Sequence, residues 1–241
     1  LQQPIYLDNN ATTPLDKRVL NAMLPYFTDF YANSTSEHIA GLTVNEAVEN
    51  TAWQVAALIN ADAEEIIFTS GATEAINLAI KGLINQDKKH IITISTEHKA
   101  VLETCAFMES MGFEISYLPV NPDGLLDLHL LDETITDKTL FFIGMLSNNE
   151  TGVIQNVSEI SSILKSRNVL FMCDATQAVG KIPVDVKTLG IDLLTLSAHK
   201  FYGPKGIGAL YVSAKAKIKL LPQITGGGHQ KKLRSGTLNV P

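Results

Sequence analysis

The chain has 241 residues, of which 45% are hydrophobic, and it carries a formal net charge of −6 with a pI near 5.5. This composition supports one large core and argues against a nucleic-acid-binding or polybasic membrane-binding surface. No apolar run reaches the roughly 18 residues of a transmembrane helix, and the N-terminus has no signal-peptide pattern. Two cysteines make no disulfide framework, so we expect a reducing, cytoplasmic location.

The first sixty residues predict little strand. Residues 1–15 are expected to form an extended N-terminal arm, and residues 16–241 one large α/β domain. Residues 16–30 predict a short helix that Pro25 interrupts. The polar stretch 31–41 predicts a loop, and the apolar spacing of residues 44–60 predicts a helix.

From residue 66 onward, apolar strand candidates alternate with helical patterns. This alternation predicts a mainly parallel seven-stranded sheet with helices on both faces. The last strand follows its predecessor through GPKGIG, which is too short for a helical crossover, so we expect it to be antiparallel. The predicted strands are 66–69, 91–95, 114–120, 140–146, 169–173, 193–196 and 209–212, and the clearest helices are 73–83, 99–111 and 158–167.

Reactive side chains follow two of these buried strands. Asp174 ends the run 169–173, and Lys200 lies shortly after the run 193–196. Ligands of open α/β sheets bind beyond the carboxyl ends of the strands. Pyridoxal phosphate requires this pair, because its aldehyde forms an imine with a lysine and its ring nitrogen pairs with an aspartate. Taken singly, the two residues are better explained as a helix cap and a solvated loop residue, but together with the flanking sequence they predict this cofactor.

The flanking motifs are more specific. SAHKFYGPKGIGAL and CDATQAVGK resemble the cofactor lysine and aspartate motifs of the cysteine desulfurases, a class V aminotransferase group of fold-type I pyridoxal phosphate enzymes. The resemblance extends from YLDNNATTP (6–14) to RSGTLNVP (234–241). It implies that residues 16–241 form the large domain of a fold-type I PLP-dependent transferase. We expect the C-terminal small domain of that family to have no counterpart among these residues.

The resemblance also assigns candidate cofactor-binding residues. Lys200 and His98 would be catalytic: Lys200 carries the cofactor and takes the substrate Cα proton, while His98 stacks on the ring and assists proton transfer. The phosphate would be bound by Ala72, Thr73, Ser197 and His199, the ring and its phenolic oxygen by Asp174, Asn149 and Gln177, and the partner subunit's phosphate by Thr237.

Each of these assignments has a plainer alternative. Ala72 and Thr73 could simply start a core helix, a histidine after a strand is usually incidental, and Asn149 could be a turn residue. No G-x-x-x-x-G-K-[ST] motif supports a nucleotide site, and the six histidines show no metal-ligand spacing.

The function implied by the resemblance is conversion of L-cysteine to L-alanine. The sulfur would leave as an enzyme persulfide for iron–sulfur cluster assembly or another sulfur acceptor. A homodimer is expected, with Thr237 shared between sites. Selenocysteine lyases and other class V aminotransferases share most of these residues, and a non-catalytic cofactor-binding fragment is the alternative from a different class. The family's nucleophilic cysteine and carboxylate-binding arginine match no residue here, so we expect this chain alone to bind the cofactor without completing desulfuration.

Overall fold

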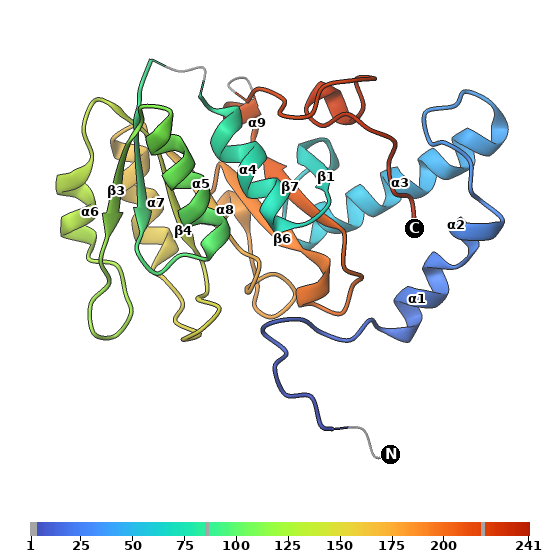
Figure 1. Cartoon of the computed structure of the whole chain (residues 1–241), viewed down its shortest axis with the longest axis horizontal. Helices are drawn as coiled ribbons and strands as arrows, with labels where there is room; N and C mark the ends of the chain where they lie inside the picture. The colour runs from blue at the N-terminus through green and yellow to red at the C-terminus, as the bar shows by residue number, and fades with distance from the viewer. Residues whose placement is uncertain (1–3, 85–86, 218–219) are drawn as a thin grey trace.

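The computed structural model describes residues 4–84, 87–217 and 220–241. Seven strands form one sheet in the order β1-β7-β6-β5-β4-β2-β3 (Figure 1). The strands from β3 across to β6 are mutually parallel, whereas β7 is antiparallel to both β1 and β6. The mainly parallel sheet and the antiparallel last strand are therefore confirmed. The strands are β1 Ile66–Thr69, β2 His90–Ile94, β3 Glu114–Leu118, β4 Thr139–Met145, β5 Leu170–Asp174, β6 Leu193–Ser197 and β7 Gly208–Val212.

Strand side chains alternate between two apolar cores, one on each face of the sheet. In β4, for example, Phe142 packs into one core and Phe141 and Ile143 into the other. Helices cover both cores, which confirms the predicted layers. One face carries α4 Ala72–Gly82, α5 Lys99–Ser110 and α9 Ala214–Lys217; the other carries α3 Ile39–Leu58, α6 Leu128–Thr134, α7 Val157–Ser166 and α8 Val186–Leu189.

The N-terminal arm leads into two short helices, α1 Lys17–Met23 and α2 Pro25–Thr28. The Asp16 carboxylate caps α1 by accepting the Arg18 N–H at 2.7 Å, and Pro25 divides the two helices as predicted. Neither helix buries a residue, and both extend away from the sheet (Figure 1). The first three residues of the predicted arm lie outside the described residues.

Helix α3 corrects one boundary. It begins at Ile39, so the prediction of a loop was wrong for residues 39–41. The His38 ring provides the cap, because its Nδ1 accepts the Gly41 N–H at 3.2 Å. A Cβ on Gly41 would collide with the Ser36 carbonyl, so the preceding loop packs closely against the first turn of the helix. The sequence pattern also missed α6, α8 and α9, which are too short to show a helical period.

The sheet register places Asp174 beside the ends of the two neighbouring strands. Asp174 pairs with Met145 of β4 on one side and with Thr195 of β6 on the other. A single 3-10 turn, Ala198–Lys200, follows β6 directly. The carboxyl ends of β4, β5 and β6 thus lie side by side, which is the edge at which α/β sheets bind ligands.

Candidate active site

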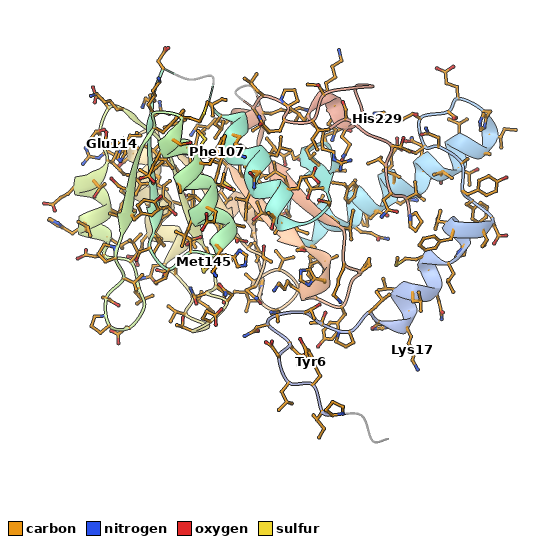
Figure 2. The ribbon with its side chains drawn as sticks, viewed as in Figure 1. Tyr6, Lys17, Phe107, Glu114, Met145 and His229 are labelled. Atoms are coloured by element: carbon orange, nitrogen blue, oxygen red, sulfur yellow. The ribbon has the colours of Figure 1, made fainter. Side chains whose placement is uncertain are left out.

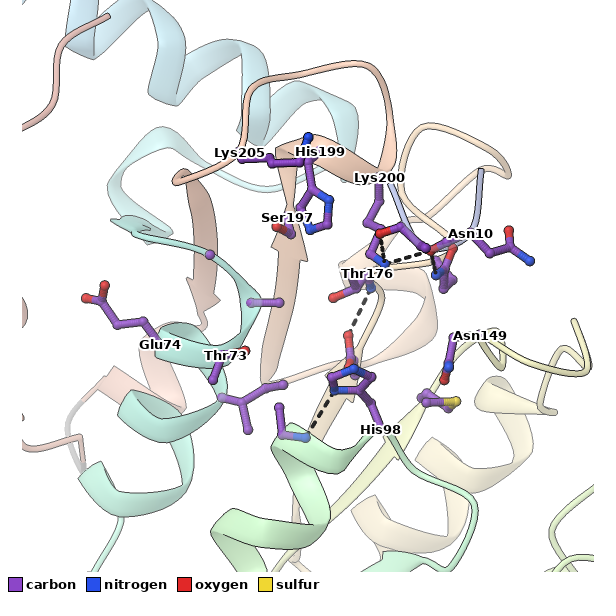
Figure 3. Close-up of a pocket in the computed structure, with 18 of the residues that line it drawn as sticks. Asn10, Thr73, Glu74, His98, Asn149, Thr176, Ser197, His199, Lys200 and Lys205 are labelled. Atoms are coloured by element: carbon purple, nitrogen blue, oxygen red, sulfur yellow. Dashed lines mark hydrogen bonds between the residues drawn. The ribbon is translucent and has the colours of Figure 1, made fainter. Parts of the chain in front are cut away.

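A cavity of about 710 Å³ lies at this carboxyl edge. The N-terminal arm, the β1–α4 turn, the start of α5 and the ends of β4, β5 and β6 contribute to its lining (Figure 3). Nine of the ten residues proposed from sequence line the cavity, namely Ala72, Thr73, His98, Asn149, Asp174, Gln177, Ser197, His199 and Lys200; Thr237 does not.

Lys200 is half-buried and points toward the N-terminal arm (Figure 3). Its Nζ donates to the backbone carbonyls of Asn10 at 2.6 Å and Ala11 at 2.9 Å. Burial lowers the pKa of Lys200, as does the neighbouring Lys181 ammonium, against the opposing charges of Asp174 and Asp8. A lowered pKa favours the neutral amine, which is the nucleophilic form.

Asp174 ends β5 with only 5% of its surface exposed. Its Oδ1 accepts the Thr176 N–H at 3.0 Å and the Thr195 hydroxyl at 3.2 Å. Among the described residues, no hydrogen bond uses Oδ2. The carboxylate is therefore anchored through one oxygen and has the other available to a ligand in the cavity.

His98 caps α5 from the cavity side. Its Nδ1 accepts the Ala100 N–H at 3.0 Å, so the neutral ring carries its proton on Nε2. Because that bond fixes the ring at the helix start, Nε2–H is the end left to serve a ligand.

The end of the cavity at the start of α4 is suited to an anion. Gly71 precedes α4 with φ at +153°, a conformation that residues with a side chain rarely adopt. The first N–H groups of the eleven-residue helix have no intrahelical partners and face this end. Ser197 is close by, since its Oγ would lie 3.8 Å from a Cβ built on Gly71. Lys205 also lines the cavity and supplies positive charge.

His199 belongs to the same end. Its Nδ1 lies 3.1 Å from the Thr12 hydroxyl of the arm. Burial lowers the pKa of His199, and the cations Lys200 and Lys205 lower it further. The ring is therefore favoured in its neutral form, which can donate one hydrogen bond to an anion.

Gln177 and Asn149 make local contacts in this structure. Gln177 Nε2 donates to the Asn10 carbonyl at 2.8 Å, and its Oε1 accepts the Lys181 ammonium at 2.6 Å. Asn149 Nδ2 donates to the Glu150 carboxylate at 2.8 Å. Both side chains line the cavity, but these bonds would have to rearrange before either amide nitrogen bound a ligand.

Thr237 is exposed and lies outside the cavity of its own chain. The segment before it is fixed near the anion end, because Arg234 Nε donates to the Glu74 carboxylate at 2.8 Å. Glu74 in turn accepts the Ser70 N–H at 2.7 Å. The role of Thr237 in a partner's site stays a prediction.

Sequence reasoning assigned no role to several residues that line the cavity, among them Asn10, Ala11 and Thr176. Asn10 and Ala11 were included in the arm without a role, although YLDNNATTP stood out as a motif. Thr176 lines the cavity, and its buried hydroxyl has no hydrogen-bond partner in the described structure. Its position two residues after Asp174 was the available signal.

Both cysteines are fully buried away from this cavity. Burial is the main cause that raises the pKa of Cys105 to about 12. Burial and the adjacent Asp174 raise the pKa of Cys173 as well. Neither thiol is therefore a thiolate near neutral pH, and neither can move to a substrate.

In the described part of the chain, no three His, Cys, Asp or Glu side chains converge as ligands for a metal ion. No helix in residues 4–84, 87–217 or 220–241 has the length and apolar character needed to cross a bilayer.

Comparison with known proteins agrees with this geometry. The Aminotransferase class-V family model matches residues 5–240. The mitochondrial cysteine desulfurase of Drosophila melanogaster is 52% identical over 99% of this chain, and the cysteine desulfurase IscS of Neisseria gonorrhoeae is 53% identical over 99%. These matches cover 53% and 60% of the two relatives, so the chain spans roughly half to three fifths of their length.

Solved structures show the same fold. A NifS-like protein superposes with a TM-score of 0.95 at 40% identity, over 99% of this chain and 66% of its own. A structure titled SspA in complex with cysteine also gives 0.95, at 41% identity, over 98% of this chain and 69% of its own. The match to the family model over nearly all residues and the fold-type I architecture lead to one conclusion: the chain belongs to the class V aminotransferase family.

Proposed function

We propose that this chain is the cofactor-binding part of a pyridoxal phosphate-dependent cysteine desulfurase. The observation that carries the proposal is the placement of Lys200 and Asp174 at the ends of adjacent strands, facing one cavity whose far end is the N-terminus of α4. A buried acid, a lysine with a lowered pKa and an anion-binding helix start are the three parts this cofactor requires.

The residues present fit the cofactor. Ala72, Thr73 and Ser197 would hold the phosphate, and the Asp174 carboxylate would hold the ring nitrogen. The orphaned Thr176 hydroxyl, which lines the cavity without a partner, supports a polar ligand at that place. The α4 dipole alone contributes only about 0.3–1 kcal/mol per charge, so direct hydrogen bonds from these residues are also needed.

When bound, pyridoxal phosphate supplies an aldehyde carbon and a ring that stabilises negative charge next to the substrate Cα. The residues of the chain would bind the cofactor and transfer the protons. Lys200 would give its amine to the aldehyde and later accept the Cα proton at Nζ. Asp174 would keep the proton on the ring nitrogen. His98 would cover the ring and use Nε2 for proton transfer.

The substrate proposal is L-cysteine. Support comes from the relatives named cysteine desulfurase and from the solved relative titled as a complex with cysteine. The products would be alanine and a protein-bound persulfide, for an iron–sulfur scaffold or another acceptor. The thiolate for that last transfer would come from outside the described residues, since Cys105 and Cys173 are buried with raised pKa values.

A homodimer in the cytoplasm is also part of the proposal. Thr237 does not reach the cavity of its own chain, which is consistent with a contact to a partner's phosphate. The outer helices leave large apolar side chains exposed that a second copy could cover, namely Leu24, Phe27, Ile39 and Trp53. Sedimentation equilibrium tests this, and a strictly monomeric chain that binds the cofactor fully would refute the shared site.

The activity test compares two readouts on the 241-residue chain. We expect cofactor binding with a yellow absorbance band, together with negligible sulfide from L-cysteine in the presence of a thiol reductant. Cys105→Ser and Cys173→Ser should change neither result. Substantial sulfide that disappears in either variant would place the nucleophile within this chain, and absence of cofactor binding would reject the proposed function altogether.

A further inference from the structure

Glu97 is a buried acid that the proposed reaction does not use. It lies between β2 and α5 and is only 5% exposed. Its Oε1 accepts the backbone N–H of Met145 at 2.8 Å, while its buried Oε2 has no partner in the described structure. No cationic side chain among the described residues forms an ion pair with it.

The Glu97 side chain supplies a hydrogen-bond acceptor to β4 beyond the end of β2. Strand β2 ends at Ile94, whereas β4 continues to Met145, which lines the cavity and is labelled in Figure 2. Successive N–H groups of a strand point to opposite neighbours. The Leu146 N–H points toward β5 and donates to the Asp174 carbonyl at 2.9 Å. The Met145 N–H therefore points toward β2, and Glu97 Oε1 occupies the acceptor position that the strand no longer provides.

This contact bears directly on the cofactor site. Met145 is the residue paired with Asp174 in the β4–β5 register, and Asn148 also donates from Nδ2 to the Met145 sulfur at 3.2 Å. The end of β4 is thus held from two sides, by the Asp174 backbone and by the Glu97 carboxyl. Without Glu97, the Met145 N–H would be buried and unsatisfied, and the strand against which Asp174 rests would lose one support.

We propose that Glu97 is a positioning residue that holds the end of β4 against Asp174, and that it does so as a neutral carboxylic acid. A buried charge without a counter-ion is far more costly than a buried neutral carboxyl, and one carbonyl oxygen suffices for the Met145 N–H. The facing titratable groups are Cys105 on α5 and Cys173 and Asp174 on β5. None is cationic, so none would stabilise a Glu97 carboxylate.

The pKa direction agrees with this geometry. Burial raises the pKa of Glu97 well above its usual range, and the nearby Asp174 carboxylate raises it further. Above the ordinary value of 4.5, the unfolded chain therefore loses the Glu97 proton while the folded chain keeps it. The folding equilibrium constant should fall about tenfold per pH unit through this one group.

The experiment uses the 241-residue chain without cofactor and three variants. Glu97→Gln keeps the acceptor and cannot ionise, Glu97→Ala removes the acceptor, and Glu103→Gln on the exposed side of α5 is the control. In urea unfolding from about pH 5 upward, the folding constant of Glu97→Gln should gain on that of wild type, by about tenfold per pH unit for as long as folded wild type keeps the Glu97 proton. For Glu103→Gln, the ratio of its folding constant to that of wild type should not change with pH. A constant ratio for Glu97→Gln as well would refute the neutral acid.

Amide hydrogen exchange tests the positioning role without reference to the cofactor. Protection at Met145 should persist in Glu97→Gln and be lost in Glu97→Ala; full protection in both would overturn the proposal.

Cofactor titration adds the link to the proposed function on which this role rests. We expect Glu97→Gln to bind like wild type near neutral pH and Glu97→Ala to bind at least severalfold more weakly. Weakening by Glu97→Gln equal to that of Glu97→Ala would mean that a carboxylate is required. If the wild-type chain failed to bind the cofactor, the proposed function would be rejected, while the exchange and unfolding results would still decide the role of Glu97.

Discussion

Asp174→Asn removes one negative charge from the cavity while keeping the shape of the side chain. Its Oδ1 would still accept the Thr176 N–H and the Thr195 hydroxyl, which now lie at 3.0 and 3.2 Å. The change falls on Oδ2, which would become an N–H donor facing the ring nitrogen of the cofactor. A bond to a charged group contributes about 1.5–3 kcal/mol. Its loss corresponds to an increase of roughly 10–150-fold in the cofactor dissociation constant.

Equilibrium dialysis of the cofactor against the 241-residue chain measures this effect. Asp132→Asn is a matched control, because Asp132 is an exposed acid paired with Arg167 on the surface, where such pairs contribute only about 0–1 kcal/mol. The control should leave binding unchanged. If Asp174→Asn bound the cofactor within about twofold of wild type, with an unchanged urea midpoint, the carboxylate would not be the ring partner and the reasoning would fail.

Three other predictions test the remaining parts of the site. Borohydride reduction should fix the cofactor covalently to the chain, and peptide mapping should locate it on Lys200. Lys200→Ala should abolish this covalent label and Lys205→Ala should retain it. A label found on Lys205 would contradict the assignment. Gly71→Ala and Gly112→Ala, at φ +153° and +84°, should each lose about 1–3 kcal/mol of unfolding free energy, but only Gly71→Ala should weaken cofactor binding by dialysis. Because the pKa of His199 is lowered from 6.5, the unfolded chain takes up this proton first as pH falls, and stability should be lost below about pH 6.5. His199→Gln should flatten that acid limb in urea titrations, and an identical limb would contradict it.

The sequence predicts those parts of the fold that depend on the pattern of neighbouring residues. The apolar run before Asp174 predicts a buried strand, and parallel packing then places its end beside the end of β6. The contact between Lys200 and the carbonyls of Asn10 and Ala11 joins residues about 190 positions apart. No local pattern encodes such a contact, because backbone carbonyls carry no sequence signature.

Glu97 was missed for a different reason. A glutamate next to a histidine after a strand predicts a solvated turn, since ionised acids are almost never fully buried unless paired. Its burial follows from the early end of β2, which leaves the Met145 N–H without a strand partner. The start of α3 was missed because a histidine cap lies outside the usual set of capping residues.

The position of β1 at the edge of the sheet has a consequence for synthesis. Within the described residues its one sheet neighbour is β7, with Ile66 paired to Tyr211, so about 140 residues of chain separate the two. At roughly 5–20 residues per second, a ribosome needs on the order of ten seconds to deliver β7 after β1 has emerged. Throughout that interval β1 presents an unpaired apolar edge that neighbouring nascent chains can join. Chaperone occupancy of residues 66–69 should therefore be highest before residue 212 leaves the exit tunnel.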